Sequence, residues 1–262
     1  MSRIAETFAA LRAENRRGFI PFITAGDPDL ETTRALVVEL ARSGATLIEL
    51  GVPFSDPMAD GPVIQRASER ALRGGVRVRD VLAVVREARR ETDVPVVLFS
   101  YYNPLLQFGH ARLCDEARRA GLDGVLVTDL VPEEAEDFAA QLRASELDMI
   151  FLVAPTSTDA RLRLVSERAS GFIYAVSRAG VTGAQAHTSV EAERLVGRVR
   201  AATDLPVAVG FGISTQEQVA EVWRYADAAV VGSAIVSEIE KGIGRPRLVA
   251  HIGGFARGLL PE

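Results

Sequence analysis

Residues 19–50 read FIPFITAGDPDLETTRALVVELARSGATLIEL and hold two apolar runs on either side of a helix-period segment. The runs, Phe19–Thr24 and Thr46–Leu50, show little alternation, which is typical of strands that are covered on both faces. Leu30–Ser43 between them has the spacing of an amphipathic helix. The loop after the first run lacks the glycine fingerprint of a dinucleotide-binding fold. The stretch therefore predicts two parallel strands joined by a helix.

The same unit recurs along the whole chain, with further helix-period segments at Val78–Arg90 and Pro132–Ala144. Eight strand candidates in about 250 residues match a closed barrel better than a doubly wound open sheet, which usually has fewer strands. We therefore expect a single parallel (β/α)8 barrel, or TIM barrel, that forms one domain over residues 1–262. The strand candidates are Phe19–Thr24, Thr46–Leu50, Val94–Ser100, Gly124–Thr128, Met149–Val153, Phe172–Val176, Pro206–Val209 and Ala228–Val231.

The composition excludes several classes of protein. With 48% hydrophobic and 25% charged residues, the chain has the make-up of a soluble globular protein, and its net charge of -5 without a basic stripe argues against nucleic-acid binding. Cys114 is the only cysteine, so we expect a buried thiol and a reducing compartment. Arg3, Glu6, Arg12 and Glu14 lie among apolar residues and predict an extra N-terminal helix rather than a signal peptide. Since no apolar run is long enough to cross a membrane, we expect a cytoplasmic protein.

Carboxylates gather where the second strand ends. Glu49 lies inside an apolar strand, where loss of water would raise its pKa and suit it for acid–base catalysis near neutral pH. Alternatively, it points outward and pairs with an arginine on a helix. The following irregular stretch, Gly51–Pro62, adds two more carboxylates. Asp56 could simply initiate a turn, and Asp60 could either cap the next helix or accept a proton from a substrate.

Glycines follow the last three predicted strands. Gly180 and Gly183 follow the sixth, within the second long irregular stretch, Ser177–Ser189. Gly210 and Gly212 follow the seventh strand, and Gly232 and Ser233 follow the eighth, directly before a helix-period run. Glycine lets backbone N–H groups approach an anion, and a helix N-terminus favours negative charge. We therefore favour a phosphate site at these loops over ordinary turns.

The rare residue types narrow the chemistry further. Lys241 is the only lysine and lies far from any strand end, which disfavours a Schiff base and a pyridoxal phosphate cofactor. His110, His187 and His251 lack metal-ligand spacing, so we expect no histidine-bound metal, while a carboxylate-bound magnesium ion stays open. The residues thus predict a barrel enzyme that acts on a small phosphorylated molecule through carboxylate acid–base catalysis.

Several blocks of sequence resemble tryptophan synthase α subunits. The longest is Glu49–Gln65, which reads ELGVPFSDPMADGPVIQ. The other blocks are Gly18–Pro28, Tyr101–Pro104, Ser177–Gly183, Gly210–Ile213 and Val231–Val236, so that the resemblance covers nearly the whole chain.

The resemblance implies a cofactor-free and metal-free retro-aldol cleavage of indole-3-glycerol phosphate to indole and glyceraldehyde-3-phosphate. Glu49 would protonate indole C3 and deprotonate the glycerol hydroxyl, and Asp60 would hold the indole N–H. Tyr174 would support Glu49, and Phe22 would pack on the indole. Five further residues match the family's closing loop and phosphate site: Thr182, Gly183, Gly212, Gly232 and Ser233.

The resemblance also implies a partner, the pyridoxal phosphate β subunit, which receives indole through a tunnel in an α2β2 assembly. Loops near Pro53, Asp56, Asn103 and Asp129 would form the contact. This chain departs from the family pattern at Thr128 and Val131, where the family commonly has proline. That departure bears on partner recognition more than on chemistry.

Three alternatives to a synthase subunit stay open. The departures from the family pattern at Thr128 and Val131 are the reason to consider a stand-alone lyase that releases free indole for another pathway. A catalytically silent activator of a β subunit is disfavoured by the intact Glu49 and Asp60. The block Pro53–Pro62 disfavours a different phosphosugar barrel enzyme.

Overall fold

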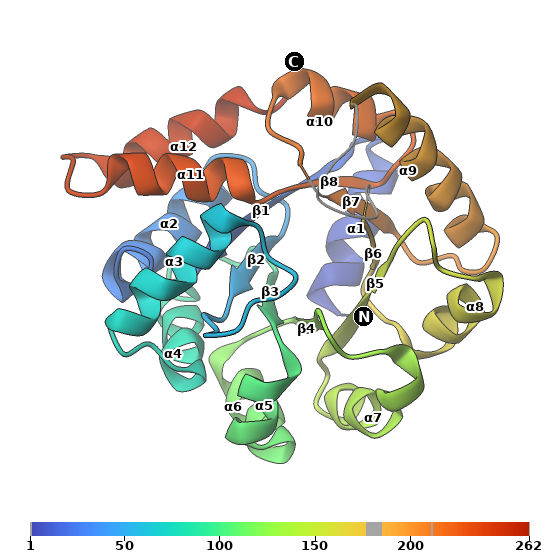
Figure 1. Cartoon of the computed structure of the whole chain (residues 1–262), viewed down its shortest axis with the longest axis horizontal. Helices are drawn as coiled ribbons and strands as arrows, with labels where there is room; N and C mark the ends of the chain where they lie inside the picture. The colour runs from blue at the N-terminus through green and yellow to red at the C-terminus, as the bar shows by residue number, and fades with distance from the viewer. Residues whose placement is uncertain (1, 177–184, 211, 262) are drawn as a thin grey trace.

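The strands close into a parallel barrel. The computed structural model describes residues 2–176, 185–210 and 212–261, without the side chains of 185–189. Within them, eight parallel strands pair in chain order from β1 to β8, and β8 pairs with β1 to close the sheet (Figure 1). Helices surround the barrel on the outside. The predicted (β/α)8 barrel is confirmed.

Every predicted strand is present, with ends that differ by at most two residues from those predicted. β2 begins two residues after the predicted Thr46, because the Thr46 side chain accepts a hydrogen bond from the Phe19 amide at 3.0 Å in place of a regular ladder contact. The strands are β1 (Gly18–Thr24), β2 (Ile48–Gly51), β3 (Val96–Ser100), β4 (Gly124–Val127), β5 (Asp148–Val153), β6 (Ile173–Val176), β7 (Val207–Gly210) and β8 (Ala228–Val231).

The helices confirm the predicted N-terminal helix and correct two details. Pro132 begins a short 3-10 helix rather than an α-helix, because the amides of Glu134 and Ala135 bond three residues back. The irregular stretch predicted to reach Ser189 ends earlier, since α9 begins at Gln185. The helices are α1 (Arg3–Ala13), α2 (Leu30–Arg42), α3 (Pro62–Arg73), α4 (Val78–Ala88), α5 (Tyr102–Phe108), α6 (His110–Ala120), η1 (Pro132–Glu134), α7 (Glu136–Ala144), α8 (Asp159–Arg168), α9 (Gln185–Arg200), α10 (Gln216–Trp223), α11 (Ser233–Gly242) and α12 (Leu248–Gly258).

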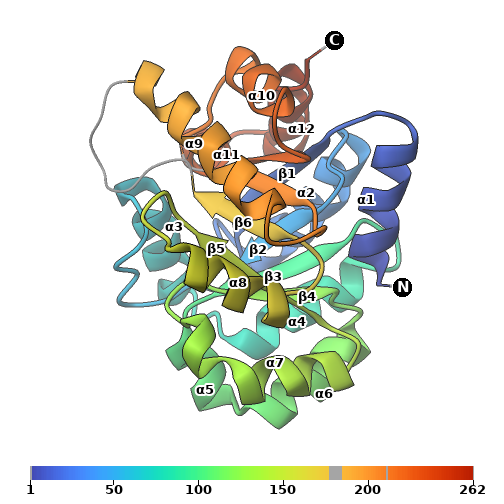
Figure 2. The ribbon, with the colours of Figure 1, turned by 90° about the vertical axis from the view of Figure 1, so that its right-hand side faces the viewer.

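The barrel interior is packed and closed at one end by α1. Phe8 of α1 lies against Phe172 with the ring centroids 5.8 Å apart, and Ile4 and Leu11 are buried beside it. Figure 2 shows α1 at one end of the barrel and α3, with the loop before it, at the other. The interior layers are built by Ile20, Leu47, Val97, Leu126, Ile150, Phe172, Ala208, Ala228 and Val230. In the part of the chain that the structure describes, the end that carries the carboxyl termini of the strands is therefore the one left open to a substrate.

A second apolar layer lies between the strands and the outer helices. Cys114 of α6 is buried there, as predicted. Among the described residues, no helix is long and apolar enough to cross a membrane.

Candidate active site

Glu49 lies in the middle of β2, beside Phe22 of β1 and Val97 of β3. It follows Leu47 of the interior cluster by two residues and therefore faces the barrel interior too. Its exposed fraction is 1%, and neither carboxylate oxygen has a hydrogen-bond partner among the described residues. Burial raises the pKa of Glu49 to about 8. The alternative of an outward carboxylate paired with a helix arginine is wrong.

Tyr174 lies on β6 and also faces the interior, where it is 7% exposed. Burial raises the pKa of its hydroxyl well above the ordinary value, and the nearby charges of Glu49 and Asp60 add to this. The phenol fits because residue 210 is glycine: a Cβ at Gly210 would overlap the Tyr174 hydroxyl. The structure thus brings Glu49, Asp60 and Tyr174 into one electrostatic neighbourhood.

Asp60 ends the loop that connects β2 to α3. It does not cap the helix, because Gly61 is the N-cap residue and Pro62 begins the first turn. The Tyr101 hydroxyl donates a hydrogen bond to the Asp60 carboxylate and accepts one from the Ala59 amide at 3.0 Å. Partial burial raises the pKa of Asp60 to about 6, against the lowering effect of the Tyr101 hydrogen bond. Asp60 therefore ionises below neutral pH, whereas Glu49 stays protonated there.

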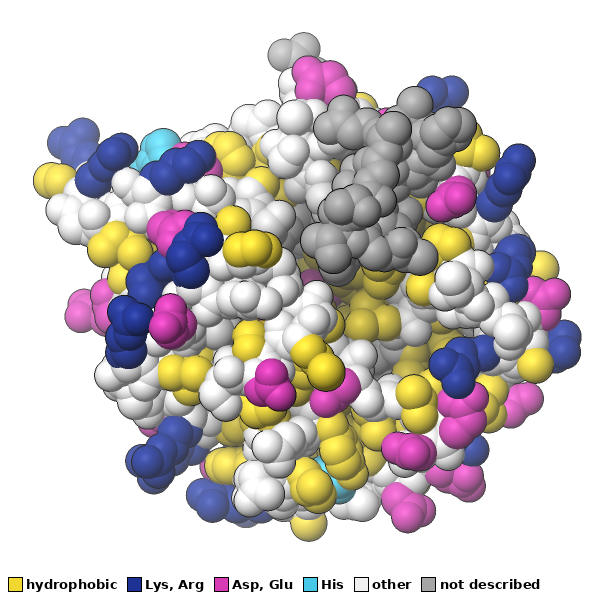
Figure 3. Space-filling model, viewed as in Figure 1, with side chains coloured by type: hydrophobic (Ala, Val, Ile, Leu, Met, Phe, Trp, Pro, Cys, Tyr) yellow, Lys and Arg dark blue, Asp and Glu magenta, His cyan; other side chains and the backbone are white. Residues whose placement is uncertain are grey.

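Phe22 forms an aromatic wall of the open barrel end beside Glu49, Asp60 and Tyr174, which we call the opening. Its ring meets Phe99 edge-on, with the centroids 5.2 Å apart. The absence of a side chain at Gly51 makes room for this ring, since a Cβ there would lie 2.6 Å from Phe22 Cζ. Figure 3 views this face and shows a hollow in its middle with hydrophobic side chains in it, while charged side chains stand around the rim.

The predicted phosphate residues lie at the ends of β7 and β8. Gly212 has a φ of +80°, a conformation that other residues rarely adopt. Gly232 is the N-cap residue of α11 and Ser233 is its first residue, with no side chain bonded to the cap. Among the described residues, no side chain caps the first backbone N–H groups of α11, which leaves them available to an anion. Thr182 and Gly183 lie outside the described residues.

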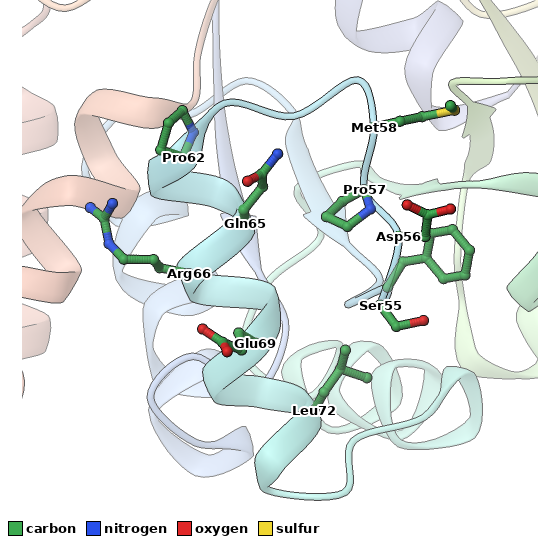
Figure 4. Close-up of a pocket in the computed structure, with 10 residues that line it drawn as sticks. Ser55, Asp56, Pro57, Met58, Pro62, Gln65, Arg66, Glu69 and Leu72 are labelled. Atoms are coloured by element: carbon green, nitrogen blue, oxygen red, sulfur yellow. The ribbon is translucent and has the colours of Figure 1, made fainter.

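The loop before α3 also borders an open pocket of about 580 Å³ on the outer side of the barrel. Figure 4 shows that Gln65 and Arg66 of α3 and Pro57 of the loop border it, while Met58 points away from α3. Met58 is 79% exposed. Neither Glu49 nor Asp60 lines this pocket, so it is distinct from the barrel opening.

The lysine and the described histidine side chains lie away from Glu49 and Asp60. Lys241 pairs with Glu238 on α11, and His251 lies 3.3 Å from the same carboxylate. His110 packs between Tyr102 and Phe138. No group of three metal-binding side chains occurs in the part of the chain that the structure describes. The His187 side chain lies outside the described residues.

The chain as a whole matches a known protein family. Residues 8–251 match the family model described as tryptophan synthase alpha chain. The chain belongs to this family. Among its relatives, the tryptophan synthase alpha chain of Solibacter usitatus is 50% identical, with 99% of this chain and 97% of the relative aligned. That of Geotalea uraniireducens is 51% identical over the same shares.

Solved structures agree with the family assignment. Tryptophan synthase subunit alpha from Legionella pneumophila superimposes with a TM-score of 0.91 at 37% identity, covering 99% of this chain and 97% of that one. A chain of tryptophan synthase from M. tuberculosis gives a TM-score of 0.87 at 42% identity, with 99% of each chain covered. The chain is thus a tryptophan synthase α-type lyase that cleaves indole-3-glycerol phosphate in tryptophan biosynthesis.

Two residues of the opening were not singled out from the sequence. In the sequence, Tyr101 stands out only as part of a family block, although an aromatic residue directly after a barrel strand is placed to reach the neighbouring loop. Phe99 was not noted, because in the sequence it is indistinguishable from other apolar residues of β3. Tyr101 lies beside Asp60 and Phe99 beside Phe22, two residues to which the family resemblance gives a role.

Proposed function

We propose that this chain cleaves indole-3-glycerol phosphate by carboxylate acid–base catalysis as the α subunit of tryptophan synthase. Glu49 gives a proton to indole C3 and takes the proton of the glycerol hydroxyl on the carbon bonded to C3. The carbon–carbon bond then breaks, its electron pair returns to the indole ring, and the hydroxyl carbon becomes the aldehyde of glyceraldehyde-3-phosphate. The two proton transfers and the electron pair of the broken bond are all accounted for without a cofactor.

The state of Glu49 is the observation that carries this proposal. A buried carboxyl with two unpaired oxygens and a pKa of about 8 is protonated at neutral pH and available to a ligand. Protein side chains usually satisfy buried polar atoms, so an unpaired carboxyl at the open end of a barrel is better explained by a substrate than by stability.

The other residues divide the remaining tasks. Asp60, ionised above about pH 6, accepts the indole N–H and stabilises the positive charge that C3 protonation places on the ring. Tyr174 supports Glu49, and Phe22 packs on the indole. Gly183, Gly212, Gly232 and Ser233 bind the phosphate with backbone N–H groups. Thr182 belongs to the loop after β6, which closes over the substrate and contacts Asp60.

We further propose that residues 1–262 act as one domain in the cytoplasm and that a β subunit binds the open end in an α2β2 assembly. Three exposed apolar side chains lie on the connections after β2, β3 and β4, namely Met58, Leu106 and Val131, at 79%, 49% and 37% exposed. Asp129 ties two of these connections together by accepting a hydrogen bond from the Tyr102 amide at 2.7 Å. Exposed apolar side chains on neighbouring connections support a partner surface.

The decisive experiment is steady-state indole release from indole-3-glycerol phosphate by the purified chain, alone and with a cognate β subunit. We expect slow turnover alone and an increase of at least about tenfold with β, because partner contact favours loop closure. A high rate that β leaves unchanged would establish a stand-alone lyase. The departure from the family pattern at Thr128 and Val131 is the reason to consider this alternative. Absence of turnover in both cases, with a stimulated β reaction, would establish a silent activator.

The two carboxyl groups predict a bell-shaped pH profile of kcat/KM. Glu49 must be protonated, so activity is present below about pH 8 and falls as the pH rises through that value. Asp60 must be ionised, so activity falls as the pH drops through about 6. Initial rates between pH 5 and 9.5 test this. A profile flat across both values would contradict the assignment of both groups.

A further inference from the structure

A network of ion pairs joins α3 to α11 and to the loop after β1. Arg70 of α3 donates to both carboxylate oxygens of Asp27, at 2.8 and 2.9 Å, and to Glu240 of α11 at 2.6 Å. Arg66, one turn earlier, donates twice to Glu240, at 2.8 and 2.7 Å. Figure 4 shows Arg66 reaching from α3 towards the neighbouring helix, which is α11 by its colour. We call these four residues the α3–α11 network.

Its burial and geometry set the network apart from ordinary surface pairs. The Asp27 side chain is 1% exposed, and those of Arg70 and Glu240 are 23% and 26% exposed. The hydrogen bonds from Arg66 and then from Arg70 lower the pKa of Glu240 to about 2. By contrast, Arg73 and Glu69 of the same helix form an i,i+4 pair that is 72% and 64% exposed. Bidentate, partly buried arginine–carboxylate pairs fix geometry, whereas exposed pairs contribute little.

Each element in the network begins or ends beside a residue of the opening. The loop with Asp27 follows β1, which carries Phe22. Helix α3 starts directly after Asp60 and Gly61, and α11 starts with Ser233. Beneath the ion pairs, Phe22 packs in one buried cluster with Ala67 of α3 and Val236 of α11. The indole end and the phosphate end of the opening therefore share this junction.

We propose that Arg70 is a positioning residue for the lyase reaction. From the C-terminal half of α3 it fixes this helix, which begins beside Asp60, against the C-terminal half of α11, whose N-terminus would bind the phosphate. The inference rests on the proposed roles of Asp60, Gly232 and Ser233. Glu240 acts as the second half of the link. Removing Glu240 frees α11 from both arginines of α3, whereas removing Arg70 frees α3 from Asp27 and leaves α11 bound through Arg66.

This asymmetry gives different kinetic results for two variants. Glu240→Gln should raise the KM for indole-3-glycerol phosphate and the Kd for glycerol 3-phosphate about tenfold and leave kcat within about threefold, because only the phosphate end moves. Arg70→Gln should raise both constants by a smaller factor, because Arg66 still binds Glu240, and should lower kcat about tenfold or more, because Asp60 moves. Arg70→Lys keeps the charge but cannot bridge both acids, and should recover only part of each loss.

Matched controls separate positioning from stability. Glu69→Gln and Arg73→Gln make the same chemical changes on the same helix without touching the network, and should leave kcat and KM unchanged. Leu142→Ala removes a buried side chain on α7 and lowers the melting temperature without affecting KM. The inference is overturned if Glu240→Gln and Arg70→Gln behave like the exposed controls, or if Leu142→Ala raises KM as much as they do.

The binding measurement keeps the outcome independent of turnover. Calorimetry with glycerol 3-phosphate reports on the phosphate end even if the wild-type chain releases no indole, a result that would refute the proposed function alone. An unchanged Kd in both network variants would refute the inference while leaving wild-type cleavage intact.

Discussion

Replacing Glu49 with Gln should lower indole release from indole-3-glycerol phosphate by about 10³-fold, with little change in the Kd for the substrate. The amide keeps the size of the side chain and cannot give or take the proton that bond cleavage requires. Stopped assays of indole formation at pH 7 measure the effect. Asp148→Asn is the matched control, because this carboxyl is also buried but lies at the start of β5, at the barrel end that α1 closes.

Unfolding by urea provides the second check on Glu49→Gln. A carboxyl with a folded pKa of about 8 binds its proton more tightly in the folded chain than in the unfolded one, whose ordinary value is 4.5. Its contribution to stability is fully present below pH 4.5 and is lost as the pH rises to 8. At pH 7 the variant should therefore gain up to about 3 kcal/mol in the free energy of unfolding. An inactive but less stable variant would point instead to a structural role.

Replacing Asp60 with Asn should lower kcat by about 10²-fold, because the developing positive charge on the indole ring loses its carboxylate. The same variant should lose the fall in activity near pH 6, since no group that ionises there remains at this position. Initial rates across pH 5 to 8 give both results. We call the fall in activity near pH 6 the acidic limb of the profile. If Asp60→Asn retains this limb, another group causes it.

Tyr101→Phe is the companion of this variant, because it keeps the carboxylate and removes one hydrogen bond to it. That bond lowers the pKa of Asp60, so its loss should move the acidic limb to higher pH. We expect a smaller loss of kcat than in Asp60→Asn, roughly tenfold. A limb that stays in place would show that Tyr101 only packs against Phe54.

The barrel was predictable because local signals repeat. Each strand is a short apolar run between helix-period segments, and the parallel topology follows from that alternation alone. Strand ends were less predictable, since side chains such as that of Thr46 replace backbone partners there. The 3-10 turn at Pro132 was missed for a related reason: its first hydrogen bonds depend on the backbone of the turn rather than on residue pattern.

The opening was predictable only in part. Glu49 stood out as a charge inside an apolar strand, but the side it faces depends on the register with β1 and β3. The hydrogen bond from Tyr101 to Asp60 joins residues about forty positions apart. The Arg70 bridge joins residues up to 170 positions apart, and any of this chain's arginines is an equal candidate for it in the sequence. Such long-range pairs form only in the folded barrel, so no local sequence pattern predicts them.

Closure of the barrel between β1 and β8 also has a consequence for synthesis. Pro21 pairs with Val231, so that roughly 10–40 s of translation separate the two partners at typical rates. Until then the edge of β1 is unpaired, and the nascent chain exposes an apolar strand that is prone to aggregation. Glu49 and Asp60 leave the ribosome well before Gly232 and Ser233. A nascent chain therefore has the proposed acid–base carboxyls well before it has the proposed phosphate site, and we expect cleavage only once β8 has joined β1.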